Sequence, residues 1–312
     1  MLIIQHTENF RIESPTIVTI GTFDGVHTGH QQILKRLQEL KQKTGLKAVV
    51  LTFEPHPRKV LFPEQKDLKL ITLVDEKLEL LDNYGVDIAV VYPFSKQFSQ
   101  LDSELYVQQI LITQLNVRHL VIGYDHKFGK DRLGDFNTLK ESSMHHDFSI
   151  EEINAKDIDN IAVSSSKIRK ALEEGNLNKA TEFLGHRFFL NGTVVKGKQL
   201  GRTIGYPTAN IKPEAIEKII PKIGVYFVSV VVEKTIYYGM LSIGHNPTTD
   251  IDSKIKLEVN IFDFSEDIYG KTLKLIFLKR LRDEKKFSSI KDLTAQLHLD
   301  KVICQDLVKE QT

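Results

Sequence analysis

Cysteine is almost absent from the 312 residues, since Cys304 is the only one. A lone cysteine excludes an intrachain disulfide framework and fits a reducing compartment. Long apolar runs are absent too, and none approaches the ~18 residues of a membrane span. The N-terminal segment has no basic region followed by a long apolar stretch, which argues against a signal peptide. We therefore expect a cytoplasmic protein that does not associate with membranes.

An excess of charge of either sign is also missing. Lysine and arginine number 42 and aspartate and glutamate 41, which gives a net charge of +1. This balance creates no general basic field, so we expect no nucleic acid partner. It is compatible with a local phosphate site, which needs only a few groups. Nothing in the sequence indicates an obligate protein partner.

The length and composition of the chain predict two globular domains. The 312 residues exceed the ~250–300 at which single cores usually split. Hydrophobic residues make up 41% and charged residues 27%, an ordinary globular composition. The pattern of apolar residues changes near residue 183, so we expect domains over 1–183 and 184–312.

The first half alternates short β-branched runs with helical patterns. The expected strands are 16–20, 47–53, 86–92 and 119–123, and the expected helices are 29–43, 75–84 and 103–115. This alternation predicts an α/β fold with an open, doubly wound parallel sheet. Ligands bind such sheets beyond the carboxyl ends of the strands.

The second half is mostly strands. After helical patterns at 166–175 and 178–184, strand-like runs cover 188–195, 225–232, 236–243, 255–264 and 272–277. Turn residues separate them, which predicts an antiparallel sandwich or small barrel. The segment 289–308 has helical spacing and is expected to pack on it.

Two histidines stand where the first strand gives way to a helix, in the run Gly-Thr-Phe-Asp-Gly-Val-His-Thr-Gly-His over residues 21–30. A helix N-terminus favours phosphate, and imidazoles can donate hydrogen bonds to it. The alternative is a glycine-rich turn with two surface histidines. Spacing alone does not choose between them, and no Walker P-loop occurs.

This run resembles the signature of the nucleotidylyltransferase superfamily. It is similar in detail to the FMN adenylyltransferase module of bacterial bifunctional riboflavin kinase/FAD synthetases. Three stretches match that family in order, namely Leu-Thr-Phe-Glu-Pro-His-Pro (51–57), Gly-Tyr-Asp-His-Lys-Phe-Gly (123–129) and Val-Ser-Ser-Ser-Lys-Ile-Arg (163–169). His126 and Lys127 depart from the aromatic-then-basic pair expected there.

The resemblance implies a Rossmann-like domain that transfers AMP from ATP to FMN and releases pyrophosphate. His27 and His30 would hold the triphosphate, and Ser165 and Arg169 its β- and γ-phosphates. The remaining implied contacts are Gly21, Phe23 and Gly29 for ATP, Asp125 for the nucleotide or a metal, and Pro55, His56 and Phe128 for the flavin.

Simpler structural roles compete with some of these assignments. Asp24 is expected to stabilise the turn through its own backbone. His56, between two prolines, would equally be a rigid loop element. The serines at 164–166 would make a good helix N-cap in any case, and Arg169 would otherwise form a surface salt bridge.

A glycine-rich basic loop precedes a Pro-Thr-Ala-Asn segment in the second half, over residues 192–210. Thr208 and Asn210 share a face in extended backbone, and their neutral oxygens suit Mg²⁺. Composition alone favours a plain turn connection. In the run 255–264, Glu258 and Asn260 lie on the face opposite the apolar positions. Glu258 either points to solvent or lines a barrel mouth and takes a proton.

The loop and the later Glu-Val-Asn-Ile-Phe-Asp-Phe strand (258–264) resemble the riboflavin kinase module. That implies a six-stranded antiparallel barrel with a C-terminal helix, and ATP beneath Gly197 and Gly201. Mg²⁺ would bind Thr208 and Asn210. Glu258 would act as general base toward the ribityl 5′-hydroxyl of riboflavin. Arg282 would contact flavin or gate the site, and Asn260 stands where histidine is more usual. Strand aromatics such as Tyr226, Phe227 and Phe262 are expected in the core.

Together these features predict a bifunctional enzyme that uses ATP and Mg²⁺ to convert riboflavin to FMN and FMN to FAD. A second hypothesis is a flavin- or nucleotide-binding regulator without catalysis. A third is that only one module is active.

Overall fold

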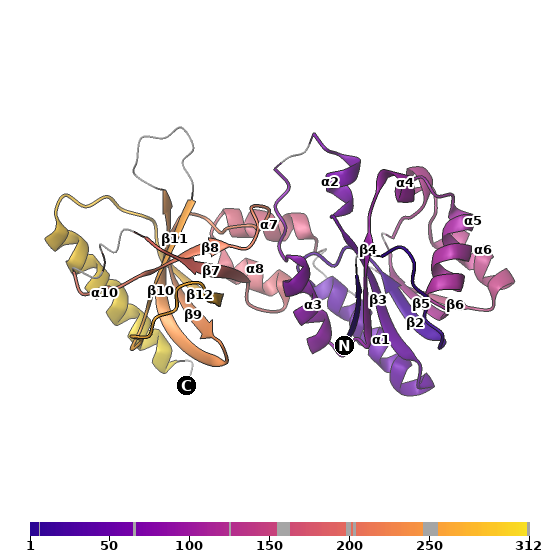
Figure 1. Ribbon diagram of the computed structural model, residues 1–312, viewed down its shortest axis with the longest axis horizontal. Helices are drawn as coiled ribbons and strands as arrows, with labels where there is room; N and C mark the ends of the chain where they lie inside the picture. Colours follow the sequence, from indigo (N-terminus) through magenta and orange to yellow (C-terminus); the bar gives the residue numbers. More distant parts are fainter. Residues whose placement is uncertain are drawn as a thin grey trace. The chain divides into compact units, whose positions relative to one another are not determined.

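The structure is a computed structural model that describes residues 1–5, 7–64, 67–124, 126–154, 163–197, 201, 204–245 and 255–310. The chain divides into two compact units, Met1–Ser165 and Ser166–Thr312. The first is built on a parallel sheet and the second on a closed antiparallel barrel (Figure 1).

The sheet of the first unit has six parallel strands in the order β1-β4-β3-β2-β5-β6. They are β1 (Leu2–Gln5), β2 (Thr16–Ile20), β3 (Lys47–Glu54), β4 (Ile88–Pro93), β5 (Val117–Gly123) and β6 (Ser149–Ile153). From β2 the chain steps to β3 and β4 on one side, then returns to β5 and β6 on the other. The strand order therefore reverses at β2, which confirms the predicted doubly wound fold and makes the end of β2 the topological switch point.

Helices cover both faces of this sheet. They are α1 (Thr28–Thr44), α2 (Pro57–Leu61), α3 (Val74–Asn83), α4 (Lys96–Ser99), α5 (Ser103–Tyr106), the π-helix η1 (Val107–Gln114), the 3₁₀-helix η2 (Lys130–Arg132) and α6 (Phe136–His146). The helices η1 and α6 share one core cluster with the strands, whereas α3 packs Leu78 against Ala89 and Val91 of β4 in a separate cluster. The predicted helix over 103–115 is correct in place, but its second half is wound more loosely, with Leu115 N–H bonded to Ile110 O.

The barrel closes in the order β10-β11-β8-β7-β12-β9, with every neighbouring pair antiparallel. Its strands are β7 (Phe189–Val195), β8 (Ala209–Pro213), β9 (Gly224–Val232), β10 (Thr235–His245), β11 (Ile255–Ile261) and β12 (Thr272–Arg282). The chain reaches it through α7 (Ser165–Glu173) and α8 (Leu177–Leu184). The six-stranded barrel is confirmed. Its short strand β8 was not visible in the sequence because it begins inside the Pro-Thr-Ala-Asn segment.

The C-terminal helix α10 (Ile290–Lys309) packs on the barrel as predicted. Phe227, Met240 and Phe262 form a cluster with Cys304 and Leu307 of α10. Burial raises the pKa of the Cys304 thiol to about 12, so it stays protonated at neutral pH. Within the described ranges, no helix is both long and apolar enough to cross a membrane.

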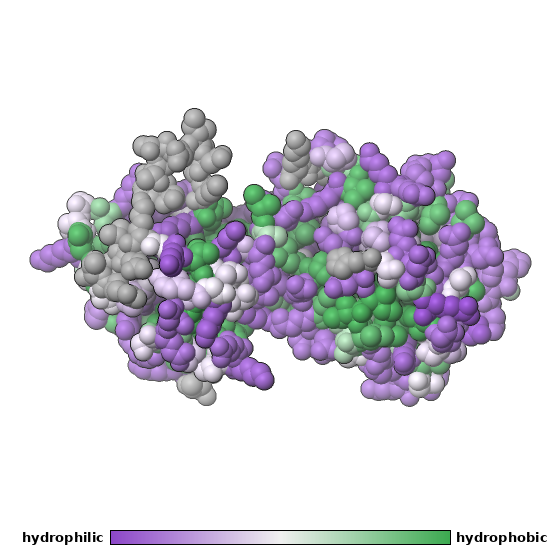
Figure 2. All heavy atoms as spheres, viewed as in Figure 1, coloured by the Kyte–Doolittle hydropathy of each residue, from purple (hydrophilic) through white to green (hydrophobic). Residues whose placement is uncertain are grey.

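The face of the protein drawn in Figure 2 is mostly hydrophilic. Figure 2 shows the face seen in Figure 1, where apolar residues gather mainly in the region of the first unit's sheet. Edge strand β1 exposes 59% of Leu2 and 44% of Ile3. Isolated exposed apolar side chains of this kind are normal on soluble proteins.

A buried ion pair fixes α10 to the barrel. Arg282 at the end of β12 donates from Nε and Nη2 to the Asp300 carboxylate at 2.6–3.0 Å. The Asp300 side chain is only 2% exposed, and Gln296 Nε2 donates to it as well. The guanidinium of Arg282, expected to contact flavin, is thus bound to the C-terminal helix in this structure.

We predict that Asp300→Ala lowers the free energy of unfolding by roughly 3–5 kcal/mol, because it leaves the Arg282 charge buried without its partner. Urea unfolding followed by circular dichroism measures the loss. The double variant Arg282→Met, Asp300→Leu serves as control and should recover most of it. A loss below about 1 kcal/mol in the single variant would show that the pair contributes little.

Candidate active sites

The turn between β2 and α1 has an uncommon backbone. Phe23, Gly25 and Val26 all have positive φ, at 47°, 86° and 40°. A β-branched residue in that region is strained, so the surrounding structure must hold it there. Phe23 and Val26 are buried, at 1% and 0% exposure, and Gly21 packs against the Phe23 ring. The sequence from Gly21 to His27 is therefore held as a fixed turn at the switch point.

Hydrogen bonds to Asp24 connect this turn to the loop before α3. The buried Oδ1 of Asp24 accepts hydrogen bonds from Ile71 N–H at 2.9 Å and Thr72 N–H at 3.0 Å. Gly25 N–H donates to Thr72 Oγ1 at 2.9 Å in return. Asp24 thus stabilises the turn as expected. Its hydrogen bonds, however, reach a different loop, which local sequence cannot reveal.

His27 and His30 are brought together at the start of α1. His27 is the N-cap of α1, and its Nδ1 accepts a hydrogen bond from His30 N–H at 3.4 Å. An accepting Nδ1 requires the proton on Nε2, which leaves Nε2–H free to donate. The two rings stack with centroids 3.7 Å apart, and His30 also lies 4.8 Å from the Phe23 ring. His30 Nδ1 is buried with no hydrogen-bond partner among the described residues.

Both imidazoles are neutral at physiological pH. Burial lowers the pKa of His27 to about 4, and Asp24 opposes this only in part. Burial, with the nearby His27 and Lys77, lowers the pKa of His30 well below its usual value. The pair can therefore donate neutral N–H groups to an anion but contributes no positive charge of its own.

A lysine that sequence reasoning missed lies at the ends of β2 and β3. Lys77 on α3 is 5% exposed, and its ammonium donates to Thr52 Oγ1 at 3.1 Å. Thr52 Oγ1 donates onward to Thr22 O at 3.1 Å. A signal was available, since Lys77 lies three residues after Val74 and four before Leu81, on the apolar side of its helix.

The other predicted residues of the first site are placed as follows. Ser165 Oγ donates to Asp24 O at 3.1 Å, which joins the start of α7 to the histidine turn. Arg169 lies one helical turn after Ser165, is 9% exposed and belongs to the second unit. Gly29 is buried in the first turn of α1. Asp125 lies outside the described residues.

The three residues expected near flavin differ in their surroundings. Pro55 is exposed, whereas His56 is 8% exposed and accepts from Arg58 N–H through Nδ1. His56 therefore caps α2, in line with its interpretation as a rigid loop element. Phe128 is 7% exposed in the core cluster, with Gly134 so close that a side chain there would overlap its ring.

The glycine loop of the second unit closes over the predicted metal ligands. A methyl group at Gly197 would overlap the Asn210 amide, and one at Gly201 would overlap Tyr206 O and touch Thr208 Oγ1. Only glycine permits this close approach. Asn260 Nδ2 donates to Pro207 O at 2.7 Å and so fixes the backbone just before Thr208.

Glu258 lies directly beside Asn210. The two residues are opposite each other on antiparallel strands β11 and β8, and Ser242 of β10 is the other neighbour of Glu258. Lys256 Nζ contacts Glu258 Oε1 at 2.7 Å, with both side chains 31% exposed. A carboxylate, an amide oxygen and a glycine loop therefore meet at one place on the barrel.

Comparison with known proteins assigns both units. Residues 9–167 match the family model described as FAD synthetase, and residues 184–308 match the one described as riboflavin kinase. A protein of Listeria monocytogenes named bifunctional riboflavin kinase/FMN adenylyltransferase is 38% identical over 91% of this chain and 90% of its own. The chain belongs to this bifunctional family. A Bacillus subtilis protein of the same name is 35% identical over 93% of this chain and 91% of its own.

A solved structure has the same architecture as this family member. It is a chain of Streptococcus pneumoniae described as a macrolide-efflux protein, with a TM-score of 0.89 and 33% identity. The match covers 98% of this chain and 99% of that one. The agreement therefore extends over both units.

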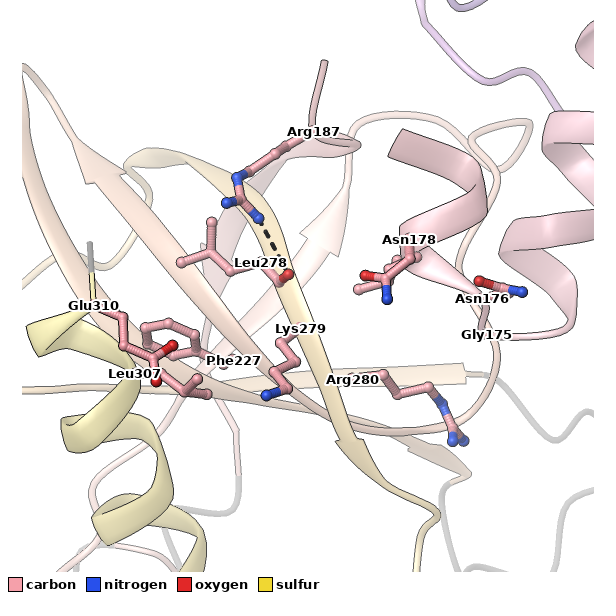
Figure 3. A pocket seen from close by; sticks show the side chains of 11 residues that line it. Gly175, Asn176, Asn178, Arg187, Phe227, Leu278, Lys279, Arg280, Leu307 and Glu310 are labelled. Atoms are coloured by element: carbon pink, nitrogen blue, oxygen red, sulfur yellow. Dashed lines mark hydrogen bonds between the residues drawn. The ribbon is translucent and has the colours of Figure 1, made fainter. Parts of the chain in front are cut away.

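A separate hollow of about 470 Å³ lies on the second unit, between the α7–α8 turn, β12 and the end of α10. Figure 3 shows Arg187 donating to Leu278 O at its rim, with Phe227 and Leu307 at its apolar side. None of the predicted catalytic or ligand-binding residues lines it.

We predict that His27 makes the folded protein less stable in mild acid. The unfolded chain takes up a proton near the usual histidine pKa of 6.5, whereas folded His27 does so near 4. Lowering the pH from 6.5 through 4 therefore favours unfolding, by up to about 3 kcal/mol from this residue.

His27→Asn tests this, because asparagine keeps an N-cap acceptor but does not titrate. Urea unfolding between pH 7 and 4 should show a smaller loss of stability in the variant than in the parent. Equal losses in both proteins would show that His27 is not the group responsible.

Proposed function

We propose that this chain phosphorylates riboflavin to FMN within residues 184–312 and adenylylates FMN to FAD within residues 1–183. The observation that carries the proposal is that both family models match this one chain, in order and over nearly its whole length. The curated relatives that share this arrangement are named for both activities. Its partners are small molecules, namely ATP, riboflavin and FMN, with no need for nucleic acid, a membrane or a second protein. We place the activity in the cytoplasm.

In adenylylation, an FMN phosphate oxygen attacks the α-phosphorus of ATP and pyrophosphate leaves. Charge gathers on phosphate oxygens, so catalysis rests on positioning and electrostatic stabilisation. His27 donates its Nε2–H to the triphosphate and His30 offers its unused ring nitrogen. The fixed turn contacts ATP through Gly21, Phe23 and Gly29. Ser165 and Arg169 bind the β- and γ-phosphates. Asp125 positions the nucleotide or a metal, and the flavin site is lined by Pro55, His56 and Phe128.

In the kinase, Glu258 removes the proton of the ribityl 5′-hydroxyl as that oxygen attacks the γ-phosphorus of ATP, and ADP leaves. Lys256 orients the carboxylate through their 2.7 Å contact. Gly197 and Gly201 bring the loop backbone over the phosphates of ATP. Thr208 and Asn210 present neutral oxygens that suit Mg²⁺, which neutralises phosphate charge when bound. Arg282 contacts flavin or gates the site, and its ion pair with Asp300 of α10 fixes its position.

We predict that Glu258→Gln abolishes FMN formation from riboflavin, because an amide cannot take the hydroxyl proton. General base removal costs typically 10²–10⁴-fold in rate. FAD formation from supplied FMN should stay at the parent rate, since it uses the other unit. Chromatography of the flavins measures both rates in one sample. A variant that still phosphorylates riboflavin at the parent rate would remove Glu258 from the role of base.

We predict the opposite pattern for His30→Ala. FAD formation from FMN should fall about 10²–10³-fold through loss of one preorganised donor. Riboflavin phosphorylation should not change. The kinase rate therefore serves as the internal control for folding, and FAD formation at the parent rate would exclude phosphate binding by His30.

A further inference from the structure

The ammonium of Lys77 is buried without an adequate partner among the residues that the structure describes. It has three donors and makes one hydrogen bond, to the neutral hydroxyl of Thr52. It forms no ion pair with any described residue. Burying a cation is unfavourable unless it is paired, and a neutral side chain such as methionine would fill the same volume. A lysine at this position therefore calls for an anion that the described residues do not supply.

The nearby acids do not fill this role. Asp24 uses Oδ1 to accept from two backbone N–H groups, and Glu54 acts on Lys77 only as a charge at longer range. Both acids favour the charged ammonium, while burial lowers the pKa of Lys77. The structure thus holds a cation near two carboxylates without a direct contact to either.

The position of Lys77 is fixed next to the histidine turn. The loop before α3 is bound to Asp24 and Gly25 through Ile71 and Thr72. Lys77 donates to Thr52, and Thr52 donates to the carbonyl of Thr22. The next residue in the chain is Phe23, whose ring contacts His30. The charge of Lys77 also contributes to the low pKa of His30. These contacts place the ammonium beside the His27–His30 pair, at the topological switch point of the sheet.

The histidine pair supplies no positive charge of its own. His27 and His30 are neutral, so they donate hydrogen bonds without balancing the negative charge of a polyphosphate. A fixed positive charge in a buried site is worth far more than the same charge in water.

We infer that Lys77 is a further phosphate-binding residue of the first unit, whose ammonium contacts the polyphosphate of ATP and the pyrophosphate product beside His27 and His30. This inference rests on the proposed adenylyl transfer. It adds an ammonium group, supplied by α3, to the two neutral imidazoles.

The test compares Lys77→Met, Lys77→Arg and, as a matched removal of an exposed lysine from the same unit, Lys43→Met. We expect Lys77→Met to lower kcat/KM for ATP in FAD formation about 100-fold. Its affinity for inorganic pyrophosphate, measured by calorimetry, should fall at least about 10-fold. Lys77→Arg should recover part of both losses, and Lys43→Met should change neither. Riboflavin phosphorylation should match the parent in all three, and Lys77→Met should unfold at a temperature no lower than that of the parent.

A folded Lys77→Met variant with pyrophosphate affinity and FAD formation within threefold of the parent would overturn the inference. If that variant does not fold, Thr52→Val decides, because it keeps the ammonium but removes its only hydrogen bond. Weaker pyrophosphate binding would support the inference, and unchanged binding would show that Lys77 only maintains the fold. A parent protein that makes no FAD would refute the adenylyl transfer itself, which is a separate outcome.

Discussion

The first site depends on one buried carboxylate. Asp24 accepts hydrogen bonds from the backbone of Ile71 and Thr72, and so joins the turn after β2 to the loop that starts α3. Because of this connection the turn can keep Phe23 and Val26 in an unfavourable backbone region. In that conformation His27 is the N-cap of α1. The hydrogen bonds of Asp24 also fix the start of α3, from which Lys77 reaches the ends of β2 and β3. The phosphate site that we propose at the histidines and the lysine therefore depends on this one connection.

In the barrel, the register of neighbouring strands brings the predicted site residues together. Glu258 and Asn210 meet because β11 and β8 pair with these two residues opposite each other. Asn260 is two residues further along β11, so its side chain shares the face of Glu258 and binds the carbonyl of Pro207. The asparagine found where histidine is more usual therefore has a structural partner, and it holds the loop that presents Thr208.

Local patterns were sufficient for most of the fold. Strand β2 is a continuous buried run with the predicted bounds Thr16–Ile20. In β11, Glu258 is less buried than its apolar neighbours Leu257 and Val259, as the alternation of residue types predicted. Strands β1 and β8 were missed because they are too short to show a clear periodicity. Strand β6 was missed because its charged residues hide the alternation of apolar and polar positions.

The contacts that complete the sites could not be predicted locally. Asp24 and Ile71 are 47 residues apart, and the Lys77–Thr52 pair is separated by 25. Arg282 was expected to contact flavin or gate the site, and its ion pair with Asp300, which depends on where α10 packs, was not foreseen. Such pairings follow from the tertiary fold, and a single sequence gives no sign of them. The motifs therefore proposed the site residues, while the structure shows which other residues contact them.

The most direct test of the account is a time course of the purified chain with riboflavin, ATP and Mg²⁺, with the flavins separated by chromatography. The account predicts that FMN appears first and that FAD follows as FMN is consumed. Formation of FMN alone would contradict the assignment of the first unit. A folded protein that binds flavin but forms neither product would contradict the account as a whole and favour a binding protein without catalysis.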